Sequence, residues 1–178
     1  MKYGKYEIKK VAVNDRMSEE TVNFSLDLYV DGKKFAAVSN DGRGGCHRTH
    51  AYPPFTRRDV DRVEEEMAQD EFLVDSDFER FDNAINTLLL LDDAARNIKR
   101  MIKTKAVWVD GNELYSSGYT NSRVPDEALF DRIRVQYPGV TILNTMTVEA
   151  SAVESVKAAR RKNEAELAAD PLPGVPRI

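Results

Sequence analysis

The sequence predicts an α+β fold in which a mixed, mostly antiparallel sheet of about five or six strands packs on one long helix, with smaller helices flanking it. Three observations lead to this prediction. Apolar and polar residues alternate over 22–30, and the Asp31-Gly32 pair that follows is a strong hairpin signal. Apolar residues recur at spacings of three and four over 77–103, which is the period of a helix. A second Asp-Gly pair at 110–111 separates two short runs of apolar character.

The first third of the chain is typical of antiparallel strands. Residues 6–13 fit a strand with a bulge at 9–10, where the alternation of apolar residues changes phase. A return strand over 33–39 follows the first Asp-Gly turn. A two-residue turn places Leu28 opposite Phe35, so we expect both side chains to face the core.

A capping box predicts where the first helix begins. Thr56 is spaced from Asp59 as the two partners of such a box, and an apolar stripe at Val60, Val63 and Met67 follows. The remaining elements are, in order, the long helix, strands at 106–109 and 113–115, a helix that ends near 137, a strand at 140–143 and a helix over 147–169. We therefore expect a single domain over 1–169 and a Pro-rich flexible tail over 170–178.

Composition narrows the class of protein. The chain has 178 residues, a net charge of −4 and one cysteine, so it cannot form an internal disulfide. Its pI of about 5.3 disfavours direct general DNA binding, which needs many basic contacts to phosphate. The first residues lack the apolar run of a signal peptide, and the longest purely apolar run is Leu88–Leu91. We expect a cytoplasmic protein without membrane contact, and the sequence does not indicate its oligomeric state.

Charge is distributed unevenly along the chain. Residues 1–58 carry 11 Lys/Arg and 7 Asp/Glu, whereas 59–93 carry 13 Asp/Glu and only 2 Lys/Arg. This pattern predicts either an ordinary solvated helix surface or an acidic face that docks a partner. The candidate residues of that acidic partner face are Glu64, Glu65, Glu66, Asp70, Glu71, Asp75 and Asp77.

One glycine-rich loop collects unusual residues. The segment 40–50 holds the only cysteine and both histidines, together with three of the nine glycines. Arginine and histidine donate hydrogen bonds to anionic groups, and glycine lets a backbone approach a partner closely. The candidate ligand- or partner-binding residues are Asn40, Asp41, Gly42, Arg43, Gly44, Gly45, Cys46, His47, Arg48, His50 and Tyr52.

Several kinds of chemistry fit this loop in part, and a structural turn fits it as well. Cys46, His47 and His50 are too few for a zinc shell without a carboxylate, so we expect no metal and no cofactor. Cys46 would be a nucleophile if Arg43 and Arg48 lowered its pKa and a histidine activated it. Successive glycine amides can also cradle an anion. No catalytic residue is assigned, and a non-enzymatic role is favoured.

The run Val38-Ser39-Asn40-Asp41-Gly42-Arg43-Gly44-Gly45, placed after a hairpin, resembles a segment of small uncharacterised proteins of bacteriophages and prophages. The resemblance also extends over 137–144. It implies a protein that acts in the host cytoplasm, where it binds and modulates a host protein or nucleoprotein complex, including a defence complex. We therefore expect an interaction protein that inhibits its target through the acidic face, the basic loop or both. The alternative is a small anionic-ligand or nucleotide-binding protein, or an enzyme, with its site in the Asn40–His50 loop. There Asp41 would orient the ligand, arginines would hold it and a histidine would transfer protons.

Overall fold

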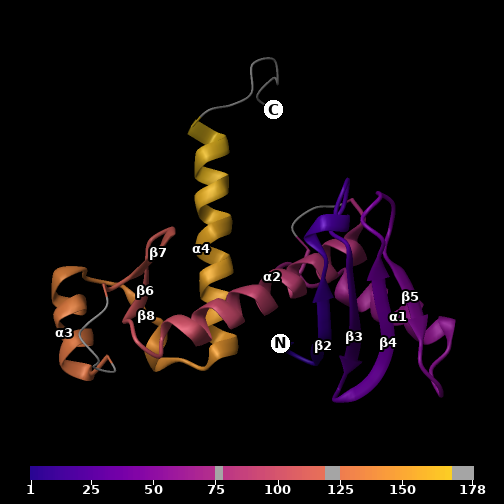
Figure 1. Cartoon of the computed structure of the whole chain (residues 1–178), viewed down its shortest axis with the longest axis horizontal. Helices are drawn as coiled ribbons and strands as arrows, with labels where there is room; N and C mark the ends of the chain where they lie inside the picture. Colours follow the sequence, from indigo (N-terminus) through magenta and orange to yellow (C-terminus); the bar gives the residue numbers. More distant parts are fainter. Residues whose placement is uncertain (75–77, 119–124, 170–178) are drawn as a thin grey trace. The chain divides into compact units, whose positions relative to one another are not determined.

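A computed structural model describes residues 1–74, 78–118 and 125–169 (Figure 1). These residues form four α-helices and two antiparallel sheets, which confirms the α+β class. The strands divide into sheets of five and three strands, so the expectation of one sheet was wrong. Periodicity identifies strands but does not show which strands pair. The long helix separates the strands of the first sheet from those of the second along the chain.

The elements follow one another in this order: β1 (Lys2–Tyr3), β2 (Tyr6–Val13), η1 (Asp15–Met17), β3 (Phe24–Val30), β4 (Lys33–Asn40), β5 (Arg48–Ala51), α1 (Arg57–Met67), α2 (Arg80–Met101), β6 (Val107–Asp110), β7 (Glu113–Ser116), α3 (Glu127–Gln136), β8 (Thr141–Ile142), η2 (Leu143–Thr145) and α4 (Val148–Ala169). Among the described residues, no helix combines the length and apolar character that crossing a membrane requires.

The chain divides into two compact units, Met1–Asp92 and Asp93–Ile178, and α2 continues from the first into the second. The expectation of a single domain over 1–169 stays a prediction. The Pro-rich tail over 170–178 lies outside the described residues.

The first unit is built on the sheet β1-β2-β3-β4-β5, in which every pair of neighbouring strands is antiparallel. One face of this sheet forms the core together with α1 and the first part of α2. The largest fully buried side chains of the unit come from the strands, the helices and the segment between α1 and α2: Ile8, Leu28, Val38, Val60, Met67, Leu73, Ile85, Leu88 and Leu91. Burial of such side chains contributes about 1.5–3 kcal/mol each, so this face holds the unit together.

Two local predictions are confirmed. The β2–β3 register shifts between Lys9 and Ala12, which is the bulge expected from the change of phase. The backbone N–H of Thr56 donates to the Asp59 carboxylate at 2.8 Å, and the capping box begins α1 as expected.

The register of the first hairpin differs from the prediction. A bulge shifts the pairing after the turn, so that Leu28 lies opposite Ala36 and not opposite Phe35. Phe35 is still buried, because the bulge lets it turn toward the core. As a consequence Ala37 lies opposite Asp27, on the other face of the sheet.

The second unit contains the sheet β7-β6-β8, whose central strand packs on both faces. Val107 and Val109 belong to one cluster with residues of α2, η2 and α4. Ala106 and Trp108 belong to another, with Phe130 of α3 and two further apolar residues. The strand alternates between these clusters because successive side chains point to opposite faces.

Asn144 joins three backbone segments of this unit. Its Oδ1 accepts from the N–H of Val107 at 2.7 Å, and its Nδ2 donates to the carbonyls of Ile102 and Lys105 at 3.3 and 2.9 Å. The side chain therefore fixes the end of α2 to the start of β6.

We predict that Asn144→Ala lowers the free energy of unfolding of the second unit by about 2 kcal/mol, because it removes hydrogen bonds from partly buried backbone groups. Urea denaturation followed by fluorescence measures this, since the only tryptophan, Trp108, lies in this unit. Thr145→Ala, which loses one hydroxyl contact to Ile142, is the control and should cost less. If the Asn144→Ala variant unfolded at the same urea concentration as the wild type, Asn144 would not be needed to join α2 to β6.

Candidate functional site

The glycine-rich loop is shorter than the sequence predicted. Arg48 and His50 belong to β5, which pairs with β4, and Tyr52 follows that strand. The loop proper covers 41–47. The alternation of apolar and polar residues did not predict β5, because its sequence, Arg-Thr-His-Ala, has no such alternation.

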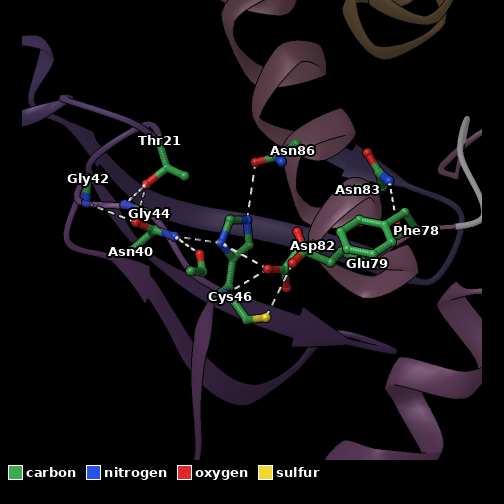
Figure 2. Close-up of polar contacts among 12 residues, drawn as sticks. Thr21, Asn40, Gly42, Gly44, Cys46, Phe78, Glu79, Asp82, Asn83 and Asn86 are labelled. Carbon is green, nitrogen blue, oxygen red and sulfur yellow. Dashed lines mark hydrogen bonds and ion pairs between the residues drawn. The ribbon is translucent and has the colours of Figure 1, made fainter.

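Asn40, at the end of β4, organises the loop (Figure 2). It is buried, with 5% of its surface exposed. Its Oδ1 accepts from the Thr21 hydroxyl at 2.7 Å and from the N–H of Gly42 at 2.8 Å. Its Nδ2 donates to the carbonyl of Gly45 at 3.0 Å and lies 3.2 Å from His47 Nδ1. One amide therefore connects both ends of the loop.

His47 extends these contacts to α2. We assign the ring proton to Nε2, which lies 3.1 Å from Asn86 Oδ1, because Asn40 Nδ2 donates to Nδ1; the Asp82 carboxylate lies 3.6 Å from that same Nδ1. The His47 backbone N–H donates to Asp82 at 2.7 Å, and its ring meets Phe24 edge-on at 4.8 Å. We call Thr21, Asn40, His47, Asp82 and Asn86 the Asn40–His47 network. Both ring nitrogens of His47 are thus engaged in structural contacts.

Gly42 makes the closest backbone approach in the loop. A Cβ at this position would lie 2.1 Å from the Met17 carbonyl oxygen, and its φ of +82° is one that favours glycine. Its own carbonyl accepts from three successive backbone N–H groups, those of Glu19, Glu20 and Thr21. The glycine is therefore needed for packing of the loop against the segment before β3.

Three successive loop amides already have acceptors within the protein. The N–H groups of Gly42, Arg43 and Gly44 donate to side-chain oxygens of Asn40, Asp41 and Thr21. These amides would have to give up such bonds to hold an anion. The geometry is that of a turn stabilised by its own side chains.

The surroundings of Cys46 oppose thiolate formation. Its Sγ lies 3.6 Å from a Glu79 carboxylate oxygen, and the charges of Glu79 and Asp82 raise the pKa of the thiol. The hypothesis that Arg43 and Arg48 lower the pKa of Cys46 was wrong, because the charges that face the sulfur are negative.

The potential metal ligands of the loop do not converge. The His47 side chain is buried, whereas His50 is exposed in β5. Within the described part of the chain, no three His, Cys, Asp or Glu side chains are grouped to hold a metal ion.

The face of the five-stranded sheet opposite the core is left uncovered by the described elements of the first unit. The strand register places Lys9, Asp27, Ala37 and His50 in one row across this face. We call it the open face. Its charged side chains come from all five strands and the adjacent loop: Lys2, Glu7, Lys9, Lys10, Asp27, Lys34, Asp41 and Arg48. Five Lys/Arg against three carboxylates give this face an excess of two positive charges.

Asp27 is the buried centre of the open face, with 7% of its surface exposed. Tyr52 donates its hydroxyl to this carboxylate at 2.7 Å, and the ammonium groups of Lys34 and Lys10 lie 3.2 and 3.5 Å away. Burial acts to raise the pKa of Asp27, but the hydrogen bonds and the two cations outweigh burial and hold the pKa below its usual value. One carboxylate thus positions two lysines and a tyrosine.

A hollow of about 420 Å³ lies beside this group and touches the predicted loop. Its lining includes the small side chains Ala12, Ser25 and Ser39, with Arg48 and Asp41 at one side. Arg48 and Asp41 form an ion pair at 2.7 Å, and both are well exposed. Sequence reasoning singled out Arg48 and Asp41 but missed the hollow, because small residues on separate strands give no local signal.

The predicted acidic partner face is partly neutralised. Glu64 pairs with Arg57, and Glu66 with Lys5. Asp70 accepts from backbone N–H groups of its own turn. Glu65 and Glu71 are exposed. The last two predicted members, Asp75 and Asp77, lie outside the described residues.

Comparisons with protein-family models, curated proteins and solved structures gave no match to this chain. The arguments about its function therefore rest on the geometry of its own residues.

We predict that Gly42→Ala destabilises the first unit by at least about 2 kcal/mol, because its Cβ would collide with backbone and its φ is strained. Gly45→Ala is the matched control: its φ is +81°, but a Cβ there meets nothing within 4 Å. It should cost only about 1 kcal/mol, from φ strain alone. Urea denaturation followed by far-UV circular dichroism compares the two, and equal losses would show that the approach to Met17 is unimportant.

We predict that Cys46 reacts with iodoacetamide more slowly than a free cysteine at pH 8, since a raised pKa leaves less thiolate at a given pH. The midpoint of its pH–rate profile should lie above that of a model thiol. Glu79→Gln removes the nearest negative charge and should move the midpoint down. A midpoint below that of the model thiol would contradict this reading of the site.

Proposed function

We propose that this chain is a non-enzymatic interaction protein that binds a negatively charged macromolecule on the open face of its first unit. The observation that carries the proposal is the contrast between the loop, whose side chains bond within the protein, and the sheet face beside it. The Asn40 and His47 side chains are engaged in holding the loop, whereas the described elements of the first unit leave the adjoining sheet face uncovered, and this face carries an excess of cations. Surfaces of this kind attract anionic partners over several ångströms.

The loop itself supports binding more than catalysis. Both ring nitrogens of His47 are hydrogen-bonded, and the pKa of Cys46 is raised. His50 is exposed on the open face, where a partner would reach it directly. A reaction centre needs a base whose lone pair is free to accept a proton, and His47 does not offer one.

Of the two surfaces expected from the sequence, the basic loop adjoins the open face, and we favour this side of the unit because it combines cations with two tyrosines and a hollow. Glu64 and Glu66 already have cationic partners, so the acidic face presents less charge than its composition indicated. On the open face, Asp27 faces two lysines, which leaves one positive charge in excess at the centre.

The resemblance to phage and prophage proteins extends the proposal to a biological setting. The partner would be a host protein or nucleoprotein complex in the host cytoplasm, and binding would inhibit it. A defence complex that handles nucleic acid has the required negative surface.

A second candidate is a small anionic ligand or nucleotide in the hollow. The observation that favours it is the guanidinium of Arg48 at the side of a cavity of ligand size. This candidate requires free mononucleotide or phosphate to bind without any macromolecule.

We predict that a sheet-face variant, Lys9→Ala with Arg48→Ala and His50→Ala, lowers the recovery of the partner from host lysate about tenfold or more, because it removes two cations and an exposed imidazole from the proposed interface. The control is a helix-face variant, Arg58→Ala with Glu65→Ala and Glu71→Ala, which should retain the partner. Quantitative mass spectrometry of tagged full-length protein gives the ratio, and purified partner confirms it.

Two results would contradict this proposal. Loss of the partner only in the helix-face variant would place the interface on the acidic face. Equal recovery by both variants and the wild type would show that neither surface is the interface.

A further inference from the structure

Resting on the proposed function, we propose that the open face binds single-stranded nucleic acid, with bases stacked on its tyrosines and one base seated in the hollow beside Arg48. Three features carry this inference: the placement of the cations, the two tyrosines and the shape of the hollow.

The cations of the open face are spread across the sheet. Lys2 lies on β1, Lys9 on β2, Lys34 on β4 and Arg48 on β5. Neighbouring strands are about 4.8 Å apart, so the sheet from β1 to β5 is about 19 Å wide. Lys2 and Lys34 lie in one register row, and Arg48 lies opposite Ser39, farther along β4. A phosphate backbone that crosses the strands would meet a cation on most of them, and it would compete there with Glu7, Asp27 and Asp41, which pair with Lys9, Lys34 and Arg48. The excess of two charges is small, and phosphate contacts alone would give weak binding.

Two tyrosines add a contact that phosphate does not use. The Lys9 ammonium lies 4.4 Å from the ring centroid of Tyr29, and that of Lys34 lies 3.9 Å from the ring of Tyr52. A phosphate would draw such a lysine from the ring, and a base would take its place there. Base stacking on aromatic side chains is the main sequence-tolerant contact in single-strand binding.

The hollow provides room for one base. Its volume of about 420 Å³ is within the range of small-molecule sites. Ser25 and Ser39 line it, and their hydroxyls make no side-chain hydrogen bond in the described part of the chain, so both remain able to bond a base edge. Arg48 supplies planar donors at the same place.

These features distinguish a single strand from other anionic partners. A duplex keeps its base faces stacked internally, so it would use the cations but neither the tyrosines nor the hollow. An acidic protein segment would likewise use the cations alone. The net charge of −4 further disfavours partners held only by charge.

The test uses the full chain and fluorescence anisotropy with a 5′-labelled 12-nucleotide strand, as DNA and as RNA. Competitors are the same sequence as a duplex, a polyglutamate peptide and AMP. We expect the single strand to bind at least tenfold more tightly than each competitor. Circular dichroism confirms that each variant is folded.

Three variants address the three features. Arg48→Ala should weaken binding about tenfold. Tyr29→Leu should weaken it by a similar factor, and Tyr29→Phe should restore it, because stacking needs the ring and not the hydroxyl. Ser25→Leu fills the hollow without changing charge and should weaken binding at least fivefold. The helix-face variant should bind as the wild type does.

Each other outcome overturns the inference. Equal binding of single strand and duplex, with Tyr29→Leu and Ser25→Leu unchanged, would mean attraction of phosphate by charge alone. AMP as strong as the oligonucleotide would favour a small-ligand site. If no oligonucleotide binds while the sheet-face variant still loses its lysate partner, nucleic acid is wrong and the proposed function stands. If that variant also keeps the partner, both fail.

Discussion

The first unit depends on one buried amide. Asn40 sits where β4 ends, and its four polar contacts fix the loop that follows, the segment that precedes β3 and the ring of His47. His47 in turn reaches Asp82 and Asn86 on α2. A buried polar group is costly unless it is fully paired, and a paired one admits a single arrangement of its neighbours. The network therefore specifies how the sheet and the helix of this unit meet.

This constraint also sets what remains for function. Residues that attract attention in the sequence, above all His47 and Cys46, are assigned to structure by their partners and by negative charge nearby. The proposed binding surface lies on the other face of the same strands. There Asp27 plays the equivalent part: it is buried, and it accepts a hydrogen bond from Tyr52 and pairs with two lysines. On the core side of the sheet, Asn40 fixes the loop and His47, and on the open face Asp27 holds two lysines and a tyrosine.

Much of the fold could be predicted from local patterns. The bulge in β2, the capping box of α1 and both Asp-Gly hairpins depend on residues close in sequence, so alternation and spacing identify them. The single-sheet expectation and the hairpin register failed because pairing partners and the bulge at Phe35 depend on tertiary packing. In the site, composition singled out the loop, but the role of its side chains depended on neighbours that are distant in the sequence. Asp82, Asn86 and Asp27 had no local signal, and the partners of the acidic residues come from other segments.

The most direct test of this account is the protonation and mobility of His47, measured by ¹⁵N NMR of the full chain at pH 8, above the usual titration range of an imidazole. The account predicts one tautomer with its proton on Nε2, together with slow hydrogen exchange of the Gly42, Gly44 and His47 backbone amides. A mixture of tautomers, with these amides exchanging at the rate of an unstructured loop, would contradict it. In that case the Asn40–His47 network would not hold the loop, and its side chains would again be available for chemistry.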